Sequence, residues 1–405
     1  MGQRQSKAAS AAPLVQPSLS GDLAEVKRLV GRHLATLDPS GSPSSSTSSD
    51  PRLAEYASRS DPQGNTALHA AACGGHGAVL AFLADRCGSG GKETPLLTRN
   101  GMGCTPLWLA AGYGHSDLLA DLLRRAGEVV SSSSSSTSSS SSSSTATATA
   151  TATLPQEVVL CPNGRGDTSL LAAASRGHVG CCRLLLEALD RGGGRGAAGG
   201  LAQANEAGDT PLSVAVGSGT APLDLLSLLL GERDGDGAGG GSGPGPGPGP
   251  GPVPPERRAN SSGLTPLLVA CERNFAGAAK LLLELDPSLL GQRDPGGRTP
   301  LAVAAFCGCD DVAEVLLGTG GGRTSLDDPG DVGRGGRPPL WLAARTGNAG
   351  MVRRLLDAGA DPTVKCGEDG LTAEEVAVKY GKTKVMEVFG HDVREVEVGE
   401  EGGGC

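Results

Sequence analysis

Aromatic residues are scarce in this 405-residue chain, because phenylalanine, tyrosine and tryptophan together make up only 2% of it. Glycine, by contrast, occurs 65 times. Large compact cores depend on bulky apolar side chains, so this composition argues against a few ordinary globular domains. It favours many small cores joined by linkers.

Long hydrophobic runs are also absent. No stretch of about 18 apolar residues, the length that a transmembrane helix needs, occurs in the sequence. The first 30 residues contain no apolar core of the kind found in signal peptides. The 11 cysteines are scattered and odd in number, which does not suit a disulfide framework. We therefore expect a reducing compartment, the cytoplasm, with the nucleus as the alternative.

A basic surplus is missing as well. The formal net charge is −9 and the sequence pI is about 5.3. General nucleic-acid binders normally carry an excess of lysine and arginine. Nucleic acid is therefore a disfavoured partner, and one or more proteins are the expected partners.

One local cluster could bind a metal. In the stretch GNTALHAAACGGH, the residues His69, Cys73 and His76 lie within two predicted helical turns. Residues four apart share a helix face, so His69 and Cys73 have a spacing compatible with zinc. The spacing alone leaves a metal site and a structural role open.

Motifs for other chemistry fail on inspection. The cysteines include no paired zinc spacing. The tripeptide GKT at 381–383 resembles the end of a phosphate-binding loop, but that motif requires glycine where the chain has Val376. No nucleophile elbow or kinase motif set occurs. We expect no bound metal, no cofactor and no enzymatic activity.

A short segment recurs along the chain with changes in its chemically active positions. It reads TALHAAACGGH from Thr66, TPLWLAAGYGH from Thr105 and TPLAVAAFCGC from Thr299. The shortest spacing between two copies is 34 residues. The copies begin at Thr66, Thr105, Thr168, Thr210, Thr265, Thr299, Pro338 and Thr372.

Each copy predicts a pair of short helices. Threonine can cap a helix start, proline suits the first helical turn, and the following glycine ends the helix. A Leu-rich second helix such as AGAAKLLLEL then supplies a buried face. A glycine stands two residues before each start, and three residues before it stands Asp or Asn in most copies, which predicts a turn.

From about residue 61 to residue 390, the chain resembles the ankyrin-repeat family, whose signature is TPLHxA. The resemblance implies an all-α ankyrin-repeat solenoid of stacked helix-turn-helix units with β-turn fingers, interrupted by disordered low-complexity inserts. It also implies that His69 hydrogen-bonds neighbouring backbone and that His76, like His115 and His178, lies in the turn between helices. A metal site is then disfavoured, because other copies replace the first histidine with Trp108, Leu171, Ser213, Leu268, Ala302, Leu342 or Glu375.

Composition divides the chain into repeats and inserts. Low-complexity Ser, Thr-Ala, Gly and Gly-Pro tracts cannot bury enough apolar surface to order, so the Gly-rich stretch 191–200 is also expected to be disordered. The predicted segments are a disordered N-terminus (1–12), a degenerate capping repeat (13–35), repeats (61–125, 161–230 and 259–390), disordered inserts (126–160 and 231–258) and an acidic, Gly-rich tail (391–405).

The sequence MGQRQSK matches the N-myristoylation pattern, which makes Gly2 a candidate lipidation site. A transit peptide is the alternative interpretation of the Ala/Ser-rich stretch that follows. A single myristoyl chain gives only marginal, reversible membrane binding. The motif thus predicts at most a weak, peripheral membrane contact.

The resemblance also places a binding surface at the two residues before the glycine that ends each first helix. These positions give a predicted concave-face site formed by Tyr113, Arg176, Arg273, Phe306, Arg345, Lys379 and Tyr380. Its cations predict an acidic or phosphorylated peptide segment as the partner of an adaptor or scaffold. The alternatives are ordinary solvated side chains, a nucleic-acid-associated regulator, or a regulatory subunit of an enzyme complex.

Overall fold

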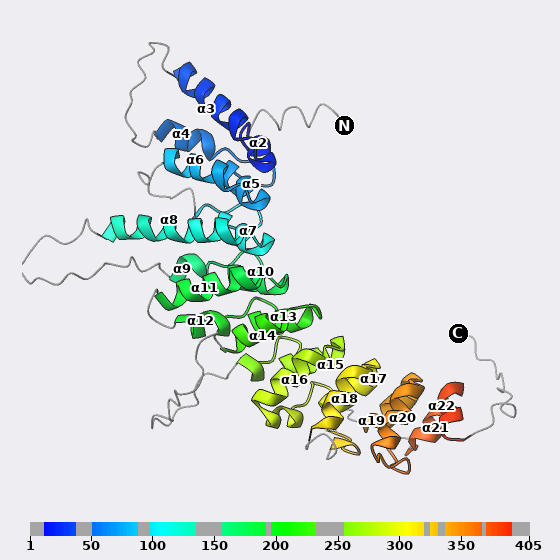
Figure 1. Ribbon diagram of the computed structural model, residues 1–405. Helices are drawn as coiled ribbons and strands as arrows, with labels where there is room; N and C mark the ends of the chain where they lie inside the picture. The colour runs from blue at the N-terminus through cyan, green and yellow to red at the C-terminus, as the bar shows by residue number, and fades with distance from the viewer. Residues whose placement is uncertain are drawn as a thin grey trace, which may run out of the picture. The chain divides into compact units, whose positions relative to one another are not determined.

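The computed structural model describes residues 12–37, 51–87, 97–134, 156–191, 196–231, 255–319, 325–330, 337–366 and 370–390. The candidate lipidation site Gly2, the tail 391–405 and most of the two long inserts lie outside these residues. The chain forms two compact units, Met1–Glu206 and Ala207–Cys405. Both units are built from helix pairs (Figure 1).

The first unit stacks helix pairs in two layers. The inner helices α2, α5, α7 and α10 pack on one another in that order, and each inner helix packs on the outer helix that follows it. The bounds are α2 (Val15–Ser20), α3 (Leu23–Leu37), α4 (Pro51–Ala57), α5 (Ala67–Gly74), α6 (Gly77–Cys87), α7 (Pro106–Tyr113), α8 (Ser116–Ser134), α9 (Gln156–Val159), α10 (Ser169–Ser175), α11 (Val179–Arg191) and α12 (Gly196–Ala202).

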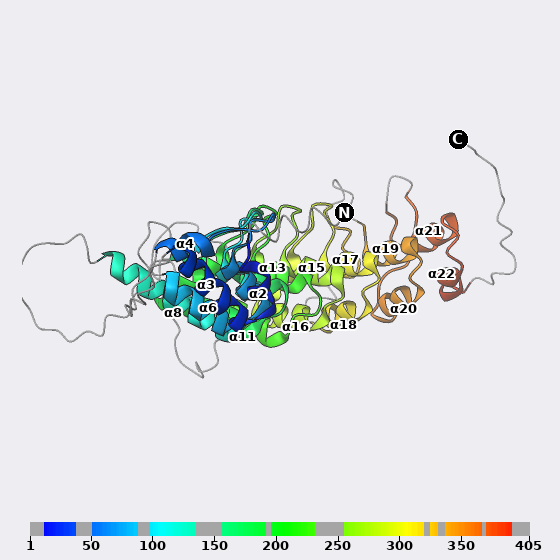
Figure 2. The ribbon, with the colours of Figure 1, turned by 90° about the horizontal axis from the view of Figure 1, so that it is seen from above.

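The second unit repeats this plan. Figure 2 shows α15, α17 and α19 in one row and α16, α18 and α20 in another. The bounds are α13 (Pro211–Gly217), α14 (Leu223–Leu230), η2 (Pro255–Arg257), α15 (Pro266–Arg273), α16 (Ala276–Leu285), η3 (Pro287–Gly291), α17 (Pro300–Cys307), α18 (Asp310–Gly318), α19 (Pro339–Thr346), α20 (Ala349–Asp357), α21 (Ala373–Lys379) and α22 (Thr383–Val388).

The inner helices begin and end where the sequence predicts. The hydroxyl of Thr105 accepts a hydrogen bond from the Trp108 backbone N–H at 3.2 Å, and Thr299 does the same for Ala302. Both threonines therefore act as N-caps. Glycine ends several of the inner helices. After the last residue of α5, Gly75 takes a left-handed conformation with φ of +74°, which glycine adopts without a steric penalty.

The turns before the inner helices are held by asparagine and aspartate side chains. Asp61 Oδ1 accepts the backbone N–H groups of Gln63 and Asn65 at 2.9 and 2.8 Å. Adjacent turns are joined as well, because Gly101 donates its backbone N–H to the Gln63 carbonyl at 2.9 Å and Asn100 Nδ2 donates to Asn65 Oδ1 at 2.8 Å. The Asp/Asn turn prediction is confirmed, and the same residues link one repeat to the next.

Histidines in the turns between helices clamp successive repeats together. His76 Nε2 lies 2.9 Å from the Leu19 carbonyl oxygen, and His115 Nε2 lies 3.0 Å from that of Cys73. The turn position that the resemblance implies for these histidines is thus confirmed. The first contact joins α2 to the turn after α5, and α2 packs on α5. The segment predicted as a degenerate capping repeat therefore carries a helix pair that docks like the others.

The predicted insert boundaries are wrong at several ends. Helix α12 lies largely inside the Gly-rich stretch 191–200, where disorder was expected. Its Ala197 is buried and donates its backbone N–H to Asp190 Oδ1 at 3.0 Å. A Cβ on Gly200 would lie 2.5 Å from Leu189 Cδ1. Gly200 thus permits close packing of α12 on α11.

Buried side chains also extend the repeats into the insert predicted at 126–160. Helix α8 continues to Ser134, with Ala126 buried, and α9 buries Val158 and Val159. In the insert predicted at 231–258, η2 ends at Arg257, whose Nε donates to Asp286 Oδ2 at 2.9 Å. Low complexity predicts these boundaries, whereas the burial and pairing of single residues extend the described helices past them.

Candidate protein-binding surface

His69, one of the two histidines in the possible metal cluster, makes structural contacts with both of its ring nitrogens. His69 is fully buried. Its Nδ1 accepts the Thr66 backbone N–H at 3.2 Å, and its Nε2 lies 3.0 Å from the Cys104 carbonyl oxygen. Burial lowers the pKa of His69, so the neutral ring donates from Nε2. The backbone contact that the resemblance implies is confirmed, and neither nitrogen is available to a metal.

No group of three or more His, Cys, Asp or Glu residues in the described part of the chain could hold a metal ion. Among the helices of that part, none is long and apolar enough to cross a membrane.

One assignment at the first-histidine position is wrong. Trp341, not Leu342, follows Pro338 by three residues, as His69 follows Thr66 and Trp108 follows Thr105. The replacement of threonine by proline at the start of this copy obscured the register. Leu342 is buried in the apolar core with Trp341.

In the first unit, the two predicted site residues lie against each other. Tyr113 ends α7 with 46% of its surface exposed. The Arg176 guanidinium carbon is 4.7 Å from the Tyr113 ring centroid, and Arg176 Nη1 donates to the Gly112 carbonyl at 2.7 Å. Arg176 therefore also connects α10 to α7, a structural role that the sequence did not predict.

In the second unit, the predicted residues lie at the ends of four inner helices. Arg273 ends α15, Arg345 lies near the end of α19, and both are exposed. Phe306 is 40% exposed and Tyr380 48%. The Arg345 guanidinium carbon lies 5.6 Å from the Tyr380 ring centroid, so these two are brought together. Lys379 is the last residue of α21 and is also exposed.

The sequence missed the neighbour of Phe306. The Arg298 guanidinium carbon lies 4.9 Å above the Phe306 ring, and Arg298 Nε donates to the buried Asp294 at 2.6 Å. Arg298 precedes the helix cap Thr299, so it comes from the turn and not from the helix end. Only an inspection of turn residues for charge would have identified it.

Within the described part of the chain, two arginines at the inner-helix ends of the second unit lack the salt bridges that some outer-helix cations form. Neither Arg273 nor Arg345 forms a salt bridge with any residue that the structure describes. On the outer helices, Arg354 pairs with Glu314 at 3.2 Å and Lys280 with Glu284 at 3.9 Å. The two inner arginines are thus candidates for contact with an external partner.

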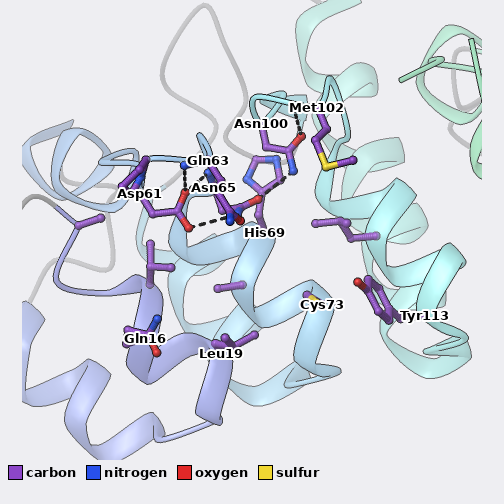
Figure 3. Close-up of a pocket in the computed structure, with 15 residues that line it drawn as sticks. Gln16, Leu19, Asp61, Gln63, Asn65, His69, Cys73, Asn100, Met102 and Tyr113 are labelled. Carbon is purple, nitrogen blue, oxygen red and sulfur yellow. Dashed lines mark hydrogen bonds between the residues drawn. The ribbon is translucent and has the colours of Figure 1, made fainter. Parts of the chain in front are cut away.

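The first unit also contains a groove of about 710 Å³ between α2, α5, α7 and two turns (Figure 3). Its apolar wall includes Leu19, Met102 and Tyr113, all exposed. Across the groove, Asn65 and Asn100 are hydrogen-bonded to each other. Of the residues predicted for the concave-face site, Tyr113 alone lines this groove. Leu19 and Met102 come from the weakest repeat and from a turn, where no apolar pattern marks them.

Two family models match the chain. The model for "Ankyrin repeats (3 copies)" matches residues 19–133 and 253–328, and the model for "Ankyrin repeat" matches 165–190 and 335–366. The matches together cover more than half of the chain. The chain belongs to the ankyrin-repeat family. No curated protein matches it.

Membership of this family bears on the surface described above. Ankyrin repeats mediate protein–protein interactions and are typically not enzymes. The inner-helix ends and the groove of this ankyrin-repeat protein are therefore candidate surfaces for protein partners. A fold-level argument identifies the type of ligand and not the ligand itself.

Proposed function

We propose that this ankyrin-repeat protein is a non-enzymatic adaptor whose inner-helix ends bind protein partners. The observation that carries this proposal is the exposure of Tyr113, Phe306 and Tyr380. The chain has only four Phe, three Tyr and two Trp residues, yet three of these nine are exposed at inner-helix ends in different repeats. Tyr113 and Tyr380 lie eight residues after the start of their copies, and Phe306 lies seven residues after its own. Aromatic residues contribute most to binding when they lie at an interface.

The charges of the same surface support a partner that is acidic or phosphorylated. Arg273 and Arg345 belong to the second unit and have no acidic partner within its described residues. Arginine binds carboxylate and phosphate groups with two parallel N–H donors. The negative net charge of the chain disfavours nucleic acid as the ligand. We also propose that the protein acts in the cytoplasm.

A reversible membrane tether through Gly2 is part of the same proposal. It rests on the MGQRQSK motif, and a single myristoyl chain would give only weak binding. Mass spectrometry of the N-terminal peptide from source cells tests this part alone. A free N-terminal glycine, or a peptide cleaved further into the chain, would exclude the tether and leave the adaptor function intact.

The main test compares two double variants of the full chain as baits in source-cell lysate. Arg273→Gln/Arg345→Gln removes two cations from the inner-helix ends. Arg353→Gln/Lys384→Gln removes two exposed cations from the outer helices α20 and α22. We expect a partner that the wild type and the outer variant capture equally, with at least a tenfold loss in the inner variant. Equal capture by all three proteins would exclude this surface.

A further inference from the structure

We propose that Trp341, Arg345 and Tyr380 form a receptor for one oxyanion of a bound peptide, a side-chain carboxylate or a phosphate. This inference rests on the proposed adaptor function and assigns a specific ligand group to one place on its surface. Trp341 and Arg345 lie in α19, and Tyr380 directly follows α21, all in the second unit.

Arg345 is oriented by two aromatic rings. Its guanidinium carbon lies 5.7 Å from the Trp341 ring centroid and 5.6 Å from that of Tyr380. Both distances fall in the range of cation–π attraction, about 6 Å. The side chain donates no hydrogen bond to any described residue. A guanidinium held in this way keeps its N–H groups for a ligand while losing little freedom on binding.

A second cation lies on the same indole. The Arg337 guanidinium carbon is 5.5 Å from the Trp341 ring centroid. The Lys382 side chain is also close to the end of α19, because a Cβ on Gly347 would lie 2.9 Å from Lys382 Cδ. Two positive groups on one ring and a third at the helix end create a field that favours an anion.

Trp341 itself has an unsatisfied donor. It is only 8% exposed, and its Nε1 has no hydrogen-bond partner among the residues that the structure describes. In the first unit, Trp108 at the equivalent position donates to the Asp167 carbonyl at 2.9 Å. Asp167 precedes the cap Thr168, and the corresponding residue after Trp341 is Leu371. The Leu371 carbonyl already accepts the Cys366 N–H at 3.0 Å.

Buried polar groups in native proteins are almost always hydrogen-bonded, so an orphan indole N–H requires an explanation. An oxyanion bound by Arg345 would bring acceptor oxygens to the neighbourhood of this ring. The arrangement therefore combines a preoriented cation with a donor that lacks its acceptor.

The test uses the indole N–H signals of the full-length protein in NMR. The chain has two tryptophans, so Trp341→Phe identifies the Trp341 signal and the Trp108 signal serves as an internal control. Sodium phosphate, sodium acetate and sodium chloride are titrated at equal ionic strength. We expect a saturable downfield shift of the Trp341 signal with phosphate or acetate, none with chloride, and no change at Trp108.

Variants connect the shift to Arg345. Arg345→Gln should weaken binding at least tenfold, Arg345→Lys should weaken it less, and the outer-helix control Arg353→Gln should not change it. The same shift in Arg345→Gln, or with chloride, would overturn the proposal. Saturation at a concentration at least tenfold lower for phosphate than for acetate would identify a phosphorylated residue as the ligand, and the reverse an acidic side chain.

The two proposals can fail separately. If partner capture is lost in Arg273→Gln/Arg345→Gln but no oxyanion shifts the Trp341 signal, the adaptor surface stands and the oxyanion receptor is excluded. If the shift is present and depends on Arg345 while capture is unchanged in that variant, the receptor stands and the proposed adaptor surface is excluded.

Discussion

His69 Nε2 and the carbonyl oxygen of Cys104 lie 3.0 Å apart, and this contact joins α5 to the turn that precedes the next inner helix. The imidazole is buried, which lowers its pKa from the ordinary value of 6.5. In the unfolded chain the ring takes up a proton near pH 6.5, whereas the folded protein resists protonation. The stability that the buried neutral ring of His69 contributes is thus fully present above about pH 6.5 and is lost as the pH falls toward the folded-state pKa.

Replacing this histidine should reduce the pH dependence of stability. We expect His69→Gln to lower the free energy of unfolding at pH 7.5 by about 1–2 kcal/mol, because a buried hydrogen bond is weakened. Between pH 7.5 and 5.0 the variant should lose less stability than the wild type. Urea unfolding at both pH values measures this difference. His178, whose pKa burial also lowers, is retained in both proteins, and an equal loss on acidification would contradict the assignment to His69.

The glycine that ends α5 is needed for two reasons, which a matched pair of variants separates. Gly75 has φ of +74°, and a Cβ there would lie 2.7 Å from the His115 ring. Gly219 has φ of +69° with nothing within 4 Å of such a Cβ. Both alanine variants incur the backbone cost, about 1 kcal/mol. Gly75→Ala should cost at least about 1 kcal/mol more in thermal or urea unfolding, and equal costs would show that the His115 contact yields freely.

Cysteine reactivity should follow burial. Cys307 is exposed, whereas Cys181, Cys182 and Cys271 are buried. Burial raises the pKa of Cys181 to about 11 and that of Cys182 and Cys271 further, which keeps the reactive thiolate form rare. Iodoacetamide at pH 8 followed by peptide mass spectrometry should label Cys307 at least tenfold faster than these three. After unfolding in urea, the rates should converge, and early labelling of Cys271 would mean that α15 opens readily.

The repeats could be predicted from sequence because each one encodes its own start and end. Thr105 caps a helix and Gly75 ends one through local backbone chemistry, which needs no distant partner. The position of Trp341 was misassigned where this local signal fails, since Pro338 replaces the threonine from which the register is counted. The proposed oxyanion receptor depends on this residue.

Features that depend on packing between segments were not predictable. Gly200 reads as part of a flexible tract, but its lack of a side chain admits Leu189. The contact between Arg298 and Phe306 joins a turn to the far end of a helix, and no sequence spacing encodes it. The exposed site residues were identified by their place in the repeat. Their neighbours, which determine orientation and charge, required the structure.

Two arginines of the predicted concave-face site should respond differently to the same substitution. Arg176 donates to the Gly112 carbonyl and lies over the Tyr113 ring, so Arg176→Gln removes contacts between two repeats. We expect it to lower the free energy of unfolding by about 1 kcal/mol. Arg273 is exposed and forms no salt bridge within the described residues, so Arg273→Gln should stay within about 0.5 kcal/mol of the wild type.

Circular dichroism during urea unfolding measures both changes, with Arg353→Gln on an outer helix as the control for a neutralised surface cation. A stability loss in Arg273→Gln equal to that in Arg176→Gln would mean that the arginines of the predicted concave-face site are chiefly structural. That result would weaken the case for a binding surface. The expected difference has a practical consequence. Binding tests should use Arg273 and Arg345, because a loss of binding in Arg176 variants would combine the removal of a contact with the loosening of α7 against α10.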